Sequence, residues 1–532
     1  MCRPSFYRSP VLGWSGQVYE TENPAENFTR SERGRVRGTM QYPRIIQGGM
    51  GVAISNWRLA RTVSSLGHLG VVSGTVIDTV LARRLQCGDP GGHMRRAMAH
   101  FPWPDMVQRI IDRYFVRGGK ADDKPFKSVP MFALQSKREL LELTVVANFV
   151  EVFLAREGHS GPVGINLLQK VEVPTLPSLY GAMLAGAAYV LMGAGIPREI
   201  PGVLDALARG DEATMKYSVM GATDQDNFRL RFDPKAFAPG PLPIVERPQF
   251  LAIIASTTLG ASLMKRATGR IDGFVIEAPS AGGHNAPPRG RLQLSDAGEP
   301  LYGPKDEVDL ARIADLGRPF WLAGSRARPE ALRDALRRGA TGVQVGTSFA
   351  LCRDSGMDPK VRAKIMNGLR TGEVTVKTDP LASPTGFPFK VVEHLEGTIA
   401  DQDTYEKRNR VCDLGYLRSA YKKDDGTVGQ RCPAEPQKHF VKKGGEVEAT
   451  EGRKCLCNAL MANIGLGQSR SSGYVEQALV TCGDDLTTGV ARLVRKFGEG
   501  YGAQDVIADL MEPVRAAERK ARIPVTPLIV PA

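Results

Sequence analysis

The sequence lacks any run of about eighteen apolar residues, the length that a membrane-spanning helix needs. It also lacks a run of about five or more basic residues, and a basic stripe interleaved with aromatic side chains. The net charge of +13 would otherwise suggest nucleic acid as a partner. We therefore interpret the excess positive charge as a surface that attracts anionic ligands, and we expect neither nucleic acid nor a membrane as a partner.

The N-terminus has no continuous apolar segment of the kind found in secretory signals. Arg3, Arg8 and several prolines interrupt every apolar stretch there. We therefore expect a cytoplasmic protein, in which the eight cysteines are mostly reduced thiols.

Four of these cysteines, Cys412, Cys432, Cys455 and Cys457, lie within a charged C-terminal segment. Four cysteines can hold zinc tetrahedrally, but structural zinc sites usually contain pairs separated by about two to four residues. Only Cys-x-Cys occurs here, so we expect buried free thiols and no metal site.

Short apolar segments alternate with helical patterns along the middle of the chain. Eight segments with strand character have Arg44, Val71, Val163, Ala188, Phe250, Asp272, Pro319 and Thr341 as anchors. Helical patterns between them cover 55–66, 176–185, 199–209, 258–268 and 329–338. This alternation places the chain in the α/β class and predicts a (β/α)₈ barrel, the TIM-barrel fold. A doubly wound open sheet is the alternative, but no Gly-x-Gly-x-x-Gly follows the first strand.

The composition divides the chain into three parts. Residues 1–41 have no periodic pattern and are expected to be a poorly ordered extension. The barrel is expected over 42–400, with a helical insertion at 75–128, an irregular proline-rich excursion at 212–245 and a long loop at 285–310. Residues 401–532 are expected to form a cysteine-containing C-terminal extension, with helices at 474–480 and 503–522.

The most informative stretch follows the strand that ends at Glu277. It reads Ala281-Gly282-Gly283-His284. Small residues let a backbone approach a flat ligand closely, and histidine suits proton transfer near neutral pH. At the end of a barrel strand this order is typical of an active site, with His284 as a base. The alternative is a glycine-rich turn with a solvated histidine. Glu277 could be a back-up base, although we favour a solvated or paired carboxylate.

Two further turns follow the seventh and eighth strands, at Gly324-Ser325 and Gly346-Thr347. The loops after these strands commonly hold a phosphate in (β/α)₈ barrels, bound by backbone N–H groups and here also by the Thr347 hydroxyl. The alternative is two ordinary turns.

Two other strand ends carry weaker signals. Met50 and Gly51 follow the first strand, and Asn166, at the end of the third strand, could bind the edge of a heterocycle. Met50 taken alone is more often a core residue.

Together these segments resemble the nitronate monooxygenases, also called 2-nitropropane dioxygenases, which are related to FMN-dependent enoyl-acyl-carrier-protein reductases. The resemblance rests on 46–51, 164–166, 281–284, 323–325 and 342–347, and it covers roughly residues 42–355. The chain differs from the family in Gly48-Gly49-Met50, where Ala-Pro-Met is more usual, in Ser325, and in its long C-terminal segment.

The resemblance implies a flavoprotein with FMN as cofactor and the nitronate monooxygenase reaction, which needs a small-molecule substrate and O₂. It places the FMN phosphate at Gly324, Ser325, Gly346 and Thr347. Met50, Gly51, Asn166 and Ala281 to Gly283 would then lie against the ring system, and His284 would be the catalytic base. The rival interpretations are an NAD(P)H-dependent enoyl-thioester reductase and a non-catalytic scaffold that binds a phosphate ligand. The sequence is compatible with a homo-oligomer.

Overall fold

The computed structural model describes residues 42–522, and side chains through 514. The expected extension at 1–41 therefore lies outside the described residues. Eight parallel strands close into a barrel in the order β1-β11-β10-β9-β8-β4-β3-β2. Their bounds are β1 Ile45–Gln47, β2 Leu69–Ser73, β3 Val163–Leu168, β4 Tyr189–Gly193, β8 Gln249–Ile254, β9 Gly273–Glu277, β10 Phe320–Ala323 and β11 Gly342–Val345. The predicted (β/α)₈ barrel and all eight strand positions are confirmed.

The barrel strands are buried on both faces because helices cover them outside and side chains fill the interior. Strand β10, for example, has no exposed residue, and Trp321 donates its ring N–H to the carbonyl of Pro43, just before β1. The helices that cover the strands are α1 Trp57–Ser65, α5 Arg138–Arg156, α6 Thr175–Leu184, α7 Ile200–Arg209, α9 Thr257–Arg266, α10 Leu310–Ala314 and α11 Pro329–Arg337.

Local sequence signals set where these helices begin. The side chain of Asn56 accepts the N–H of Leu59 at the start of α1, and Ser256 does the same for Leu259 at the start of α9. Each bond satisfies a donor that the first helical turn leaves unpaired. Pro329 occupies the first turn of α11, where its missing N–H has no effect on helix bonding.

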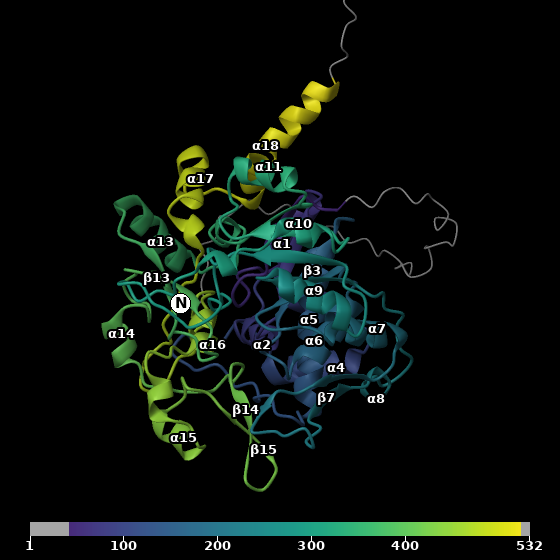
Figure 1. Ribbon diagram of the computed structural model, residues 1–532. Coiled ribbons are helices and arrows are strands. Elements are labelled where there is room, and N and C mark those ends of the chain that lie inside the picture. Colours follow the sequence, from purple (N-terminus) through teal and green to yellow (C-terminus); the bar gives the residue numbers. More distant parts are fainter. Residues whose placement is uncertain (1–41, 523–532) are drawn as a thin grey trace, which may run out of the picture. The chain divides into compact units, whose positions relative to one another are not determined.

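The remaining helix position of the barrel is filled from the far end of the chain. Helix α18, Ala503–Arg522, contacts both α1 and α11, and Figure 1 shows it in yellow beside α11. Its residues Val506, Ile507 and Leu510 are buried. A barrel strand needs a helix over its outer face, so the predicted C-terminal extension is partly barrel.

Other segments elaborate this core. Residues 75–128 contain α2 Ile77–Gln86, α3 His93–Met98 and α4 Pro104–Tyr114. Residues 212–245 are more regular than expected. Strand β5 Ala213–Lys216 pairs antiparallel with β7 Arg229–Phe232, and the segment also contains β6 Val219–Met220 and α8 Pro234–Phe237. After the barrel come α12 Thr347–Ala350, α13 Pro359–Thr371, and the antiparallel strands β12 Thr375–Asp379 and β13 Phe389–Glu393.

The C-terminal part contains α14 Gln402–Lys407, β14 Ser419–Lys422, β15 Val428–Arg431, α15 Gln437–Lys442, α16 Leu456–Ala462 and α17 Gly489–Phe497. Strand β14 pairs with β15 and also with β6, so this part shares a small sheet with the 212–245 insertion. The helix expected at 474–480 was wrong, because this segment is a loop that forms only isolated bridges. No helix within residues 42–522 is long and apolar enough to cross a membrane.

Candidate active site

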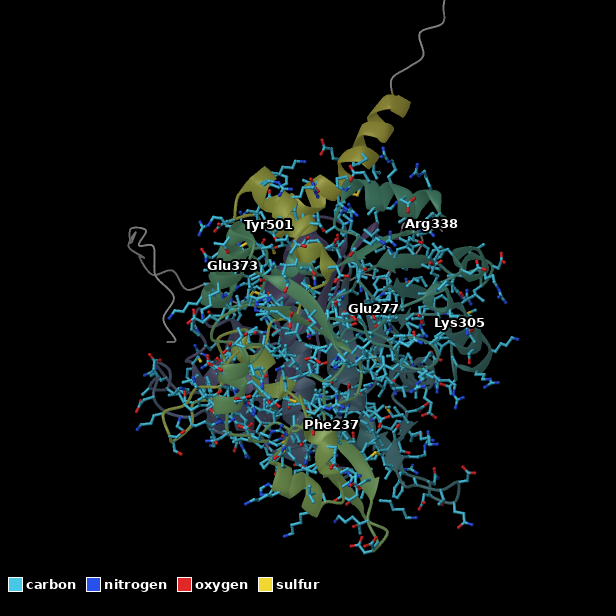
Figure 2. All side chains as sticks on the ribbon, turned by 60° about the vertical axis from the view of Figure 1, so that its left-hand side comes forward. Phe237, Glu277, Lys305, Arg338, Glu373 and Tyr501 are labelled. Atoms are coloured by element: carbon cyan, nitrogen blue, oxygen red, sulfur yellow. The ribbon has the colours of Figure 1, made fainter. Side chains whose placement is uncertain are left out.

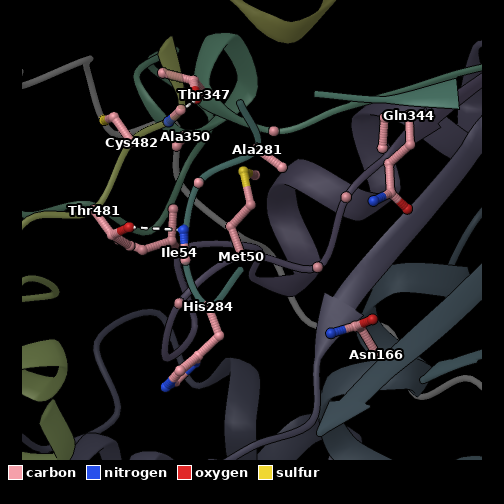
Figure 3. Close-up of a pocket in the computed structure, with 18 of the residues that line it drawn as sticks. Met50, Ile54, Asn166, Ala281, His284, Gln344, Thr347, Ala350, Thr481 and Cys482 are labelled. Carbon is pink, nitrogen blue, oxygen red and sulfur yellow. Dashed lines mark hydrogen bonds between the residues drawn. The ribbon is translucent and has the colours of Figure 1, made fainter. Parts of the chain in front are cut away.

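A cavity of about 210 Å³ lies at the carboxyl ends of the barrel strands. All eight strands contribute a lining residue, either from the strand itself or from the position after it. The lining includes all site residues expected from the sequence: Met50, Gly51, Asn166, Ala281, Gly282, Gly283, His284, Gly324, Ser325, Gly346 and Thr347. The fold therefore brings these residues, from distant parts of the chain, around one space (Figure 3).

The loop after β1 is held by two buried polar side chains. Gln47 donates its amide to the carbonyl of Val71 and to Ser55 Oγ, at 3.2 and 2.8 Å. Ser55 Oγ in turn donates to the carbonyl of Gly48 at 2.7 Å and accepts the N–H of Met50 at 2.9 Å. These bonds fix the backbone that presents Met50 to the cavity.

Gly49 is small because Asn166 packs directly against its backbone. A Cβ at position 49 would overlap the Cβ of Asn166. Asn166 ends up with its amide beside the cavity, on the same side as Gln344, as Figure 3 shows. The Oε1 atom of Gln344 is buried and has no hydrogen-bond partner within the described residues. A ligand with an N–H donor, such as a heterocycle edge, would satisfy it.

The two glycines before His284 are required for different reasons. Gly283 has φ of +85°, a conformation that side chains disfavour, and its N–H donates to Thr481 Oγ1 at 2.8 Å (Figure 3). Gly282 instead makes room for the C-terminal part, because a Cβ there would meet the nitrogen of Gly483 at 2.8 Å. The bare backbone at Gly282 therefore also serves to dock the segment around Cys482.

His284 is half-buried and fixed by two contacts. Its Nε2 lies 2.7 Å from Ser383 Oγ, and its ring packs edge-on against Phe389 at 4.8 Å between centroids. Ser383 Oγ also lies 2.8 Å from Thr385 Oγ1. When His284 donates from Nε2 to Ser383, and Ser383 donates to Thr385, Nδ1 of His284 carries the free lone pair.

Desolvation and the nearby charge of Lys170 lower the pKa of His284 to about 3. The imidazole is therefore neutral throughout the physiological pH range, as a proton acceptor must be. Desolvation also lowers the pKa of Lys170 to about 7. The Lys170 ammonium lies over the ring of Phe387 and donates to the carbonyl of Thr385 at 3.3 Å. A rise in pH through 7 thus removes the charge that disfavours protonation of His284.

Glu277 differs from the solvated or paired carboxylate that we favoured. It lines the cavity, and within residues 42–522 its carboxylate makes no hydrogen bond and no ion pair. Desolvation raises its pKa to about 7. Figure 2 shows Glu277 in the midst of the side chains, whereas Lys305 lies toward the periphery. Glu277 therefore remains a second candidate base.

The turn after β10 presents unpaired donors to the cavity. Gly324 and Ser325 both have positive φ, +90° and +51°. Their backbone N–H groups have no hydrogen-bond acceptor within the described residues, and Nε of the adjacent Arg326 is buried without a partner. Unpaired N–H groups beside a guanidinium fit a phosphate, whose oxygens accept several hydrogen bonds.

The turn after β11 is partly occupied by the chain itself. Thr347 Oγ1 accepts the N–H of Gly483 at 2.8 Å, which leaves only its own hydrogen to donate to a ligand. A Cβ at Gly346 would make ordinary contact with Met50 Sδ at 3.5 Å. Position 346 therefore has space for a side chain, and the backbone conformation there does not require glycine.

Sequence reasoning missed the site residues that come from outside the predicted motifs. They are Ser280, Thr481, Cys482 and Gly483 in the lining, and Ser383, Thr385 and Lys170 behind His284. Single small polar residues in loops carry no periodic signal. Gln344 could have been noticed, because it is a polar residue within the otherwise apolar strand β11.

No protein-family model matches the sequence, and no curated protein matches it. Solved structures that resemble the chain include FabK from Thermotoga maritima, with 16% identity over 91% of this chain and 95% of that chain and a TM-score of 0.43. A nitroalkane oxidase from Streptomyces ansochromogenes has 14% identity over 89% and 97%, with a TM-score of 0.41. The enoyl reductase domain of MlnA from Bacillus amyloliquefaciens has 11% identity over 90% and 96%, with a TM-score of 0.43. The barrel assignment rests on the strand pairing of this chain and not on these likenesses.

Proposed function

We propose that this chain is an FMN-dependent oxidoreductase that uses O₂ to oxidise alkyl nitronates, and the nitroalkanes from which they form, to a carbonyl compound and nitrite. The observation that carries the proposal is the placement of His284, a neutral imidazole fixed by Ser383 at a cavity with unpaired backbone donors. The sequence resemblance supports the same activity.

The cavity residues fit the proposed cofactor. The free N–H groups of Gly324 and Ser325 would hold the phosphate of FMN, together with Arg326. The unpartnered Oε1 of Gln344 would accept a hydrogen bond from the edge of the ring system, beside Asn166. When bound, FMN supplies the electron-accepting chemistry that no side chain of the site can supply.

The chain itself would perform the proton step. Nδ1 of His284 takes the proton from the carbon beside the nitro group, and the electron pair of the broken C–H bond moves onto the nitro oxygens. Ser383 accepts from Nε2 and so keeps the lone pair on Nδ1. The protonated imidazole is disfavoured while Lys170 is charged.

Because Lys170 loses its charge as the pH rises through about 7, turnover of neutral nitroalkanes should increase over the same range. Lys170→Met should abolish most of this increase and raise the rate at pH 6, since no charge then opposes protonation of His284. Lys170→Arg keeps the charge at every pH and should stay slow throughout. Initial rates of kcat/KM between pH 5.5 and 8.5 measure this effect. Identical profiles for the three proteins would remove Lys170 from the mechanism.

Glu277 also titrates near pH 7, so it needs a separate test. Glu277→Gln keeps the shape of the side chain but removes its basicity. We expect turnover of a neutral nitroalkane to fall by less than about tenfold, because a lost general base typically costs about 10²–10⁴-fold. Steady-state kinetics measure this loss, provided that the variant binds as much flavin as the wild type. A loss in the larger range would make Glu277 the base.

The experiment that tests the proposed function is anaerobic mixing of the purified protein with either NADPH or an alkyl nitronate, followed by flavin absorbance. We expect the nitronate to change the spectrum and NADPH to leave it unchanged. Rapid bleaching by NADPH, with no response to nitronate, would favour the enoyl-thioester reductase instead. Protein that binds no FMN would contradict both enzymes and leave the scaffold interpretation.

A further inference from the structure

A second cavity, of about 430 Å³, lies beyond the carboxyl ends of β3 and β4. Within the described part of the chain it shares no lining residue with the active-site cavity. Gln169 and Lys170 follow β3 directly, and Met220 and Ala420 come from β6 and β14 of the small sheet. Natural sites for small molecules have volumes of about 300–1,000 Å³. The cavity is therefore large enough for an organic ligand.

The charged groups of this second cavity favour an anion. Its lining has two cationic side chains, Lys170 and Arg418, and one carboxylate, Glu172. The two oxygens of Glu172 accept the hydroxyl and the N–H of Ser218, at 2.7 and 3.0 Å. With all three charged groups ionised, the lining has a net charge of +1. This charge matches a ligand with a single negative charge, such as a carboxylate.

Neither cation has a carboxylate partner within residues 42–522. Lys170 donates to the carbonyl of Thr385 at 3.3 Å and lies over the ring of Phe387. Arg418 donates to backbone carbonyls, among them that of Phe132 at 2.6 Å. Desolvation lowers the pKa of Lys170 to about 7, as expected for a cation that burial penalises and no anion compensates. A ligand carboxylate would supply charge-assisted hydrogen bonds that the chain itself does not supply.

The rest of the lining favours a ligand with an apolar body and an N–H donor. Val173, Ile196 and Met220 contribute apolar side chains to the lining, and Ile196 and Met220 remain 61% and 47% exposed. The Oε1 atom of Gln169 is buried and has no hydrogen-bond partner in the described residues. An amide N–H would satisfy this acceptor. An acyl chain joined to a carboxylate through an amide has all three features.

We propose that the second cavity binds an amphipathic carboxylate of the N-acyl amino acid class. Lys170 and Arg418 would hold its carboxylate, Gln169 would accept its amide N–H, and its acyl chain would cover Ile196 and Met220.

A carboxylate bound here would act on His284 through Lys170. Thr385, which accepts from Lys170, has its hydroxyl 2.8 Å from Ser383 Oγ, and Ser383 contacts His284. The charge of Lys170 disfavours protonation of His284. A carboxylate beside the ammonium would offset this charge, so the ligand should raise turnover of neutral nitroalkanes at pH 6. This consequence rests on the proposed function, whereas the binding site itself does not.

The test of binding is isothermal titration calorimetry of the full chain with N-octanoylglycine. The neutral N-octanoylglycinamide is the matched control, because it differs only in the missing charge. We expect the carboxylate to bind at least about tenfold more tightly than the amide. Equal affinities, or no binding of N-octanoylglycine, would overturn the proposal. Tighter binding of octyl phosphate would overturn the assignment to carboxylates.

Variants locate the bound carboxylate. Lys170→Met and Arg418→Met should each weaken binding of N-octanoylglycine by about tenfold or more. Lys423→Met removes an exposed cation that follows β14 but lies outside the cavity lining, and it should leave the affinity unchanged. Equal affinities in all three variants would place the ligand elsewhere. If Arg418→Met is insoluble, the comparison of Lys170→Met with Lys423→Met still decides the question.

Initial rates at pH 6 test the effect on His284. Saturating N-octanoylglycine should raise kcat/KM of the wild type for a neutral nitroalkane toward that of Lys170→Met, and it should not change Lys170→Met. An unchanged wild-type rate, with binding shown by calorimetry, would overturn the coupling to His284. Inhibition competitive with the nitroalkane would place the probe in the active-site cavity and overturn the separate site. A protein inactive on nitroalkanes would contradict the proposed function, and calorimetry would still decide the binding.

Discussion

Replacing His284 with alanine is expected to lower turnover of neutral nitroalkanes by roughly 10²–10⁴-fold, the usual contribution of a general base. The physical reason is that Nδ1 is the free proton acceptor of a ring whose other nitrogen is held by Ser383. The variant should still fold, because Ser383 keeps its hydrogen bond with Thr385 and no buried hydroxyl loses all its partners. Initial rates with a freshly dissolved nitroalkane measure the loss.

The pre-formed nitronate provides the control for this prediction. It has already lost its proton, so its turnover by His284→Ala should fall much less than turnover of the neutral form. His284→Asn, which keeps a polar group, should behave like His284→Ala if proton removal is the role. Equal losses on the two substrate forms, with flavin still bound, would instead make His284 a binding residue. Unchanged rates on both substrate forms would show that His284 belongs to a structural turn and has no catalytic role.

Replacing Gly346 with glutamate is expected to abolish flavin retention. A side chain at position 346 would point toward Met50 and into the cavity, where a carboxylate would repel a phosphate bound at Gly324 and Ser325. The flavin released from purified protein by heat, relative to protein concentration, measures this effect.

Gly346→Ala is the matched control. Its added Cβ would meet Met50 Sδ at 3.5 Å, an ordinary van der Waals distance, so flavin content should stay close to that of the wild type. Full flavin content in Gly346→Glu would show that the phosphate binds elsewhere. Loss of flavin in both variants would point to packing at the turn rather than to charge.

Much of the barrel could be predicted because its signals are local. Strand β10 is an apolar run and β3 is apolar except for Asn166, and helices α1 and α11 begin at residues that suit a helix start, Asn56 and Pro329. The chain order of these elements then leaves few topologies. The helix expected at 474–480 was wrong because the apolar residues of this segment do not reflect a local helical pattern. They belong to a loop that packs on segments distant in the sequence.

By itself the sequence determined the barrel, the strand ends that face the cavity, and His284 among them. Only the tertiary structure decided what surrounds His284. The bonds of Gly283 to Thr481 and of Gly483 to Thr347 join residues 198 and 136 positions apart. Ser383 meets His284 across 99 positions. Such contacts leave no periodic or capping signal in either segment, because single polar atoms meet only after both segments have packed onto the barrel.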